Sequence, residues 1–176
     1  LLFLDWSYIS EVLLQFGGVG IFVSQFLVQF FIHPVVGAAT TAVIVGVSVW
    51  MLWLTMRKIN DNVALLPLLF VPSLFVVMYI ATSYHHYTGL VAIMFMAIAL
   101  WGYSLCREQS YKVRVGIGSA ITLVLYLLVG SIGMLFAVCA LLFDAVLKRE
   151  KWYLGAIYAA IACVAGSYLV HTGDII

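Results

Sequence analysis

Charged residues are scarce in this sequence, and their scarcity excludes the ordinary soluble classes. Asp, Glu, Lys and Arg make up 9% of the 176 residues, whereas hydrophobic residues make up 66% and the mean hydropathy is +1.19. A soluble domain is nearer half apolar and a quarter charged. The formal net charge is only +1, so no basic face exists to neutralise the phosphates of a nucleic acid. We therefore expect an all-α, polytopic transmembrane helical bundle that is surrounded by the lipid bilayer.

Motifs for nucleotide binding, serine hydrolysis and disulfide frameworks are also missing. No P-loop, GxGxxG or GxSxG is present. The cysteines lie in or beside apolar runs without metal-binding spacing and are interpreted as packing residues: Cys106, Cys139 and Cys163. The chain starts at Leu1 without an initiator Met or the charged region of a signal peptide, so we expect a piece of a longer protein.

Long apolar runs dominate the chain from residue 34 onward. A membrane-crossing helix needs about 20 apolar residues, and the runs predict six crossings, at residues 34–56, 63–81, 88–106, 113–129, 132–147 and 152–170. The stretch from 113 to 147 is too long for one crossing, and Gly130-Ser131-Ile132-Gly133 supplies a turn at its middle. Pro67 and Pro72 predict a kink in the second span.

The few charges have a one-sided distribution under this topology. With six crossings, all eight Lys and Arg lie on the same side of the membrane, which the positive-inside rule makes cytoplasmic. Asp144 lies four residues before Lys148 near the end of the fifth span, which predicts a local ion pair. A polar loop is expected between the third and fourth spans, and it holds Arg107, Glu108, Lys112 and Arg114.

A pair of external amphipathic helices is predicted in residues 1–33, before the bundle of residues 34–176. Asp5 can cap the first helix, near 6–16, and Gly17-Gly18 separates it from a second helix near 20–32. Because neither helix is basic, we expect the pair to lie in the membrane surface, steeply inclined to the first span. The second helix carries polar side chains four residues apart: Gln25, Gln29 and His33.

Polar side chains that share the external side are the candidates for a functional site. Asp5 is either a helix cap or a general base, and Glu11 is either the wet face of its helix or a second catalytic carboxylate. A substrate or a divalent metal could be bound by the remaining external side chains, which are Gln25, Gln29, His33, His85, His86 and His171. Histidine also favours membrane interfaces, and no HxxxH, HExxH or DxD spacing is present, so both interpretations stay open.

An acidic residue followed by external amphipathic helices is a layout with known counterparts. Asp5 follows an apolar stretch, and Gln29-Phe30-Phe31, His33-Pro34 and Gly37 open the next span. Over residues 1–60, and more weakly over 126–151, this order resembles multi-pass bacterial membrane proteins of uncharacterised function with the layout of GT-C type glycosyltransferases.

The resemblance implies a transferase that acts on a polyprenyl-linked substrate at the extracytoplasmic face of a bacterial cytoplasmic membrane. It also implies that Asp5 is the essential acid, with Glu11 second. A second acidic residue and a large soluble domain, both common in that family, are not visible here.

Two other functions fit the same composition. A non-catalytic membrane subunit or scaffold would use the external helices to bind a partner, with Asp5 and Glu11 facing solvent separately. A transferase instead requires both carboxylates to face a cavity shared with the external histidines. A transporter ranks third, because the predicted spans lack the scattered internal charges of ion-coupled transport.

Overall fold

The computed structural model describes residues 17–59, 87–130 and 132–147, together with the isolated positions 10, 78, 153, 157, 160, 161 and 164. All regular structure in these residues is helical, which confirms the all-α class. The helices are α2 (Gly18–Val28), η1 (Gln29–Ile32), α3 (Pro34–Met56), α5 (Tyr87–Leu105), η4 (Cys106–Glu108), α6 (Tyr111–Val129) and α7 (Ile132–Val146), where η marks a short 3-10 helix.

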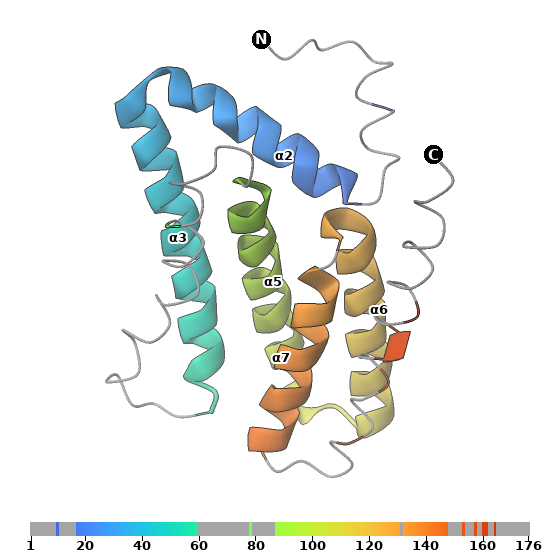
Figure 1. The fold of residues 1–176 in the computed structure, drawn as a ribbon. Coiled ribbons are helices and arrows are strands. Elements are labelled where there is room, and N and C mark those ends of the chain that lie inside the picture. The colour runs from blue at the N-terminus through green and yellow to red at the C-terminus, as the bar shows by residue number, and fades with distance from the viewer. Residues whose placement is uncertain are drawn as a thin grey trace.

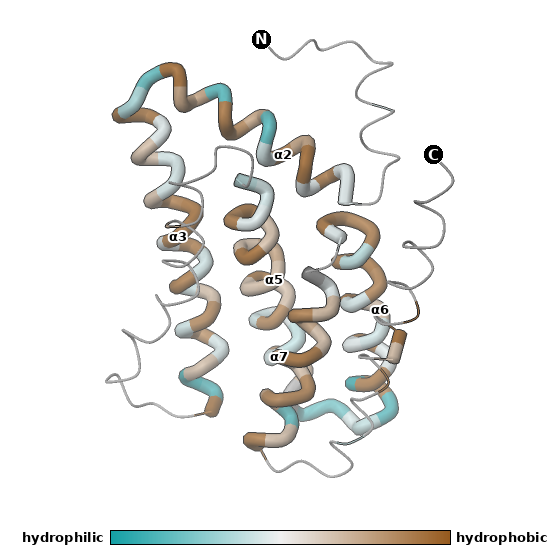
Figure 2. The backbone as a smooth tube through the Cα atoms, viewed as in Figure 1, coloured by the Kyte–Doolittle hydropathy of each residue, from teal (hydrophilic) through white to brown (hydrophobic). Residues whose placement is uncertain are grey.

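Three of these helices, α3, α5 and α6, are long and apolar enough to cross a membrane. Hydrophilic positions gather along α2 at one end of the bundle and in the α5–α6 connection at the other, with mostly hydrophobic positions between them (Figure 2). This distribution is that of a membrane protein. The runs at 63–81 and 152–170 lie almost entirely outside the described residues, so the six crossings stay a prediction.

Helix α5 occupies the centre of the bundle, where it contacts α2, α3, α6 and α7 (Figure 1). Leu90, Val91 and Ala97 on α5 are fully buried, as are Ala137 and Ala140 on α7. Alanine leaves room for the backbones to approach, and close van der Waals packing is a main source of helix association in lipid. The small residues therefore explain how α5 and α7 pack closely along the core.

Gly130 ends α6, and the chain then reverses into α7. Its φ is +78°, and its N–H donates to the Tyr126 carbonyl at 3.0 Å. The two helices lie side by side and contact each other (Figure 1). Residues 111–146 therefore form two helices and not one, with the chain reversal in the glycine-containing segment where the sequence predicts it.

Helix α2 lies across one end of the bundle and meets α3 at a steep angle (Figure 1), which confirms the predicted inclination. The break is at His33, whose backbone is extended (φ −108°, ψ 110°), and Pro34 starts α3 at a position that needs no N–H donor. A Cβ on Gly37 would lie 2.9 Å from the Phe31 ring, so only glycine fits inside this corner. Phe31 in turn packs edge-on against Tyr87 of α5, with ring centroids 5.3 Å apart.

Candidate functional site

The polar stripe of α2 and η1 holds the only predicted site residues that lie within the described part of the chain. Gln25 and His33 are exposed, and Gln29 is half-buried. Phe26 and Phe30 are exposed on the same segment, and their rings pack edge-on with centroids 5.7 Å apart. This segment thus presents both amide groups and aromatic rings at the end of the bundle, as interfacial helices do.

The other predicted site residues lie outside the described residues: Asp5, Glu11, His85, His86 and His171. In residues 17–59, 87–130 and 132–147, no three His, Cys, Asp or Glu side chains come close enough to hold a metal ion. The described stripe therefore supplies hydrogen-bonding groups, and any acid for catalysis or metal binding has to come from the rest of the chain.

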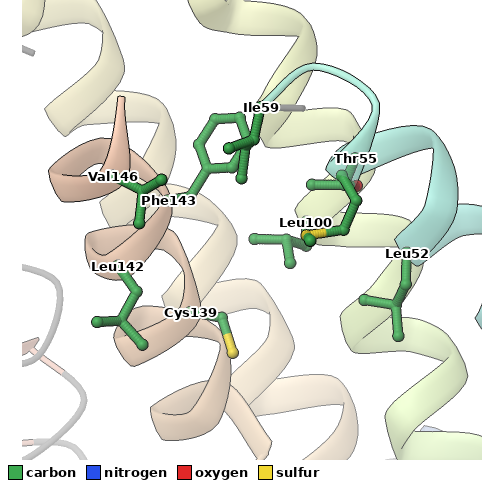
Figure 3. Close-up of a pocket in the computed structure, with 9 residues that line it drawn as sticks. Leu52, Thr55, Ile59, Leu100, Cys139, Leu142, Phe143 and Val146 are labelled. Atoms are coloured by element: carbon green, nitrogen blue, oxygen red, sulfur yellow. The ribbon is translucent and has the colours of Figure 1, made fainter. Parts of the chain in front are cut away.

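An apolar groove of about 260 Å³ lies at the opposite end of the bundle from α2, between α3 and α7 (Figures 1 and 3). Leu100 of α5 forms its back wall. The side from α3 and the turn that follows consists of Leu52, Thr55, Met56 and Ile59, and the side from α7 consists of Cys139, Leu142, Phe143 and Val146. The Thr55 hydroxyl donates to the Met51 carbonyl within its own helix, so the groove has no polar group directed at a ligand.

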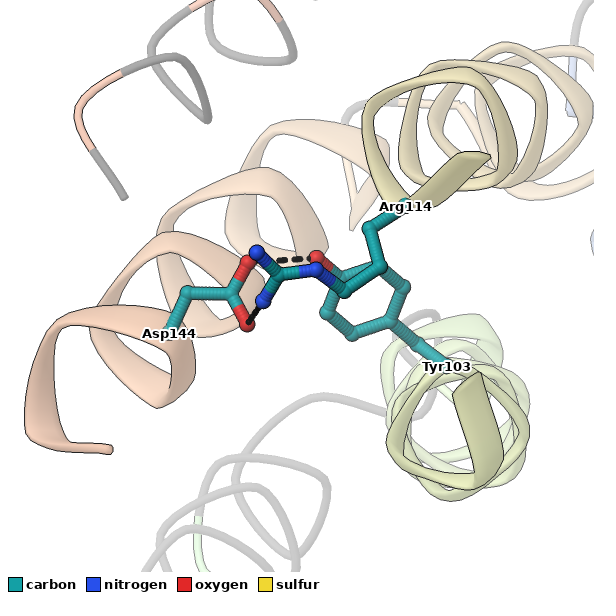
Figure 4. Close-up of polar contacts among 3 residues, drawn as sticks. All are labelled: Tyr103, Arg114 and Asp144. Carbon is teal, nitrogen blue, oxygen red and sulfur yellow. Dashed lines mark hydrogen bonds and ion pairs between the residues drawn. The ribbon is translucent and has the colours of Figure 1, made fainter. Parts of the chain in front are cut away.

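A buried polar cluster of Tyr103, Arg114 and Asp144 lies at this same end and was not predicted from the sequence. The Arg114 guanidinium donates through Nη1 to Asp144 Oδ1 at 3.2 Å, and the Tyr103 hydroxyl donates to Oδ2 at 2.7 Å (Figure 4). The side chains of Arg114 and Asp144 are only 7% and 4% exposed. The Tyr103 ring also packs against Phe143, which lines the groove.

This cluster corrects two expectations. Arg114 was expected in a polar loop, but α6 begins at Tyr111, so Arg114 is in its first turn and buried. Asp144 was expected to pair locally with Lys148, which lies outside the described residues, whereas the structure pairs it with Arg114 from another helix. The signal was the spacing along α6, because Arg114 shares a buried face with Gly118, Thr122 and Leu125.

The cluster is suited to joining helices and not to chemistry. Both carboxylate oxygens of Asp144 accept hydrogen bonds from side chains of α5 and α6, which links three helices through one carboxylate. A buried charge is tolerated when it is paired and hydrogen-bonded, and removal of one partner is costly. We therefore interpret Tyr103, Arg114 and Asp144 as a structural clamp.

A comparison with protein-family models matches residues 1–174 to a model described as "Family of unknown function (DUF6057)". The comparisons with curated proteins and with solved structures gave no match. The matched range includes every helix described above, together with the external stretch that precedes α2.

Proposed function

Since the chain belongs to the DUF6057 family, whose function is unknown, we propose a function from its own residues. The protein is a six-span membrane protein that transfers a group from a polyprenyl-linked donor at the extracytoplasmic face. The face meant is the end of the bundle on which α2 lies.

The observation that carries this proposal is the fixed position of α2 and η1 across the bundle end. At one end the Gly17 N–H donates to the Leu127 carbonyl at 3.0 Å, and a Cβ on Gly20 would lie 3.1 Å from the Val129 side chain. At the other end, the contact between Phe31 and Tyr87 attaches η1 to α5. A helix held at both ends at headgroup level supports the GT-C-like layout, in which external helices next to a span form the substrate site.

Charge supports the orientation. Arg57 and Lys58 follow the end of α3, and Lys112 lies in the first turn of α6, all at the end away from α2 (Figure 1). The positive-inside rule makes the end with these cations cytoplasmic. The α2 end is then external, where polyprenyl-linked donors would be reached from the outer leaflet.

In the proposed reaction, Asp5 is the general base that removes a proton from the acceptor hydroxyl, and Glu11 is the second carboxylate. Gln25, Gln29 and His33 offer hydrogen bonds to the polar part of the donor from the exposed side of α2. A divalent metal would need Asp5, Glu11 or the histidines outside the described residues, because the described part brings no three metal-ligating side chains together.

Replacement of Asp5 by asparagine tests this function, because asparagine caps a helix about as well as aspartate but accepts no proton. Loss of a general base lowers a rate by about 10²–10⁴-fold. We expect Asp5→Asn to insert and fold normally and to lose complementation of a deletion strain, measured as the profile of extracted lipid-linked and surface glycans. If Asp5→Asn and Glu11→Gln both complement like the parent, the transferase proposal is wrong.

A non-catalytic membrane subunit is the second candidate, and one observation favours it. Large apolar side chains remain exposed where η1 turns into α3, with Ile32 77% and Val35 82% exposed. Such a surface suits contact with another membrane protein as well as with lipid. This function predicts that Ile32→Ser with Val35→Ser weakens an assembly, while Asp5→Asn has no effect.

A further inference from the structure

The apolar groove between α3 and α7 is adjacent in the chain to two cations. Met56 and Ile59 line the groove, and Arg57 and Lys58 are the residues between them. The Arg57 guanidinium lies 4.9 Å from the centroid of the Trp53 ring, which holds it near the end of α3 by a cation–π contact. Tryptophan and arginine in this arrangement are typical of the level of lipid headgroups.

We propose that this groove is a binding site for one anionic phospholipid, with an acyl chain between α3 and α7 and the headgroup phosphate on Arg57 and Lys58. The proposal is independent of the transferase function, since the groove lies at the opposite end of the bundle from α2.

The lining of the groove selects the acyl chain. Its walls are aliphatic and aromatic side chains with a cysteine and a threonine whose hydroxyl is already bonded within α3. An apolar cavity of about 150 Å³ accepts a benzene molecule, so the 260 Å³ of this groove has room for a segment of several methylene groups. A polar ligand would find no hydrogen-bond partner inside it.

The charges select the headgroup. Basic residues at the membrane surface attract anionic lipids, and each contributes about a fivefold gain in affinity. Zwitterionic phosphatidylcholine carries the same acyl chains but no net charge. Arg57 and Lys58 should therefore favour phosphatidylglycerol over phosphatidylcholine by a factor that is lost when the two cations are removed.

The experiment is a lipid titration of the delipidated full-length protein in detergent, followed by native mass spectrometry. Phosphatidylglycerol and phosphatidylcholine with identical acyl chains are compared. We expect one tightly bound phosphatidylglycerol, and about 25-fold weaker binding after Arg57→Gln with Lys58→Gln. Lys112→Gln is the matched control, because this exposed cation lies at the same end of the bundle but away from the groove.

A second pair of variants tests the groove itself. Cys139→Trp fills it and should weaken phosphatidylglycerol binding at least tenfold, whereas Val138→Trp places the same ring on the neighbouring exposed position and should leave binding unchanged. If Cys139→Trp does not fold, the charge variants decide alone.

Equal binding of the two lipids, or an equal loss in the Lys112→Gln control, would show ordinary surrounding lipid and overturn the proposal. No bound lipid would overturn it as well, because another part of the chain or a second copy would then fill the groove.

Discussion

Replacement of Asp144 by leucine removes the carboxylate that Arg114 and Tyr103 both contact inside the bundle. The guanidinium and the hydroxyl then stay buried without that acceptor, since the side chain of Arg114 is 7% exposed and Tyr103 is 1% exposed. Removal of one partner from a buried ion pair costs about 3–5 kcal/mol. We therefore expect Asp144→Leu to lose that much of the free energy of unfolding.

The double variant Arg114→Met with Asp144→Leu separates pairing from simple loss of side chains. Replacement of both charges by apolar groups of similar size is often neutral, so the double variant should recover most of the loss. The buried Tyr103 hydroxyl should still cost about 1–3 kcal/mol in the double variant. Addition of Tyr103→Phe should recover that remainder.

The assay is equilibrium unfolding in mixed micelles, with increasing sodium dodecyl sulfate and helix content followed by circular dichroism. Glu108→Leu and Lys112→Met are matched controls, because both remove an exposed charge near the same end of the bundle. Each control should change stability by no more than about 0.5 kcal/mol. A loss below about 1 kcal/mol in Asp144→Leu, or a double variant whose loss equals the sum of the two single losses, would refute the clamp.

Two glycine substitutions test the corner and the start of α2. Gly37→Ala places a Cβ 2.9 Å from the Phe31 ring and 3.1 Å from its Cα, and should cost about 1–3 kcal/mol, whereas Gly46→Ala, with nothing within 4 Å, should be neutral in the same unfolding assay. Gly17 has a φ of +74°, so Gly17→Ala should cost about 1–2 kcal/mol, and a cost no larger than that of Gly116→Ala would contradict the assigned break.

The sequence was sufficient for the helices that have strong local boundaries. Pro34 starts α3 and Arg57 follows its end, and Gly130 ends α6, so periodicity and breakers locate them within a residue or two. The second external helix was placed near 20–32, and its last turn tightens into η1. Such boundaries depend on residues next to each other in the chain.

The buried cluster depends instead on residues far apart in the chain. Asp144 and Arg114 are 30 residues apart, and Asp144 and Tyr103 are 41 apart, so no local pattern connects them. The polar segment before α6 allowed a helix start at several positions, and a start at Tyr111 was needed to bring Arg114 into the bundle. The groove was equally invisible, because its lining combines residues of three helices that only packing brings together.

The orientation of α2 is the claim on which the proposed function depends most directly. Single cysteines at His33 and at Lys112, in a variant without the native cysteines, can be labelled in intact cells with a membrane-impermeant maleimide. The proposed topology predicts that His33→Cys reacts from outside and that Lys112→Cys reacts only after the membrane is permeabilised. Labelling of both positions from the same side, or of Lys112→Cys alone from outside, would contradict it.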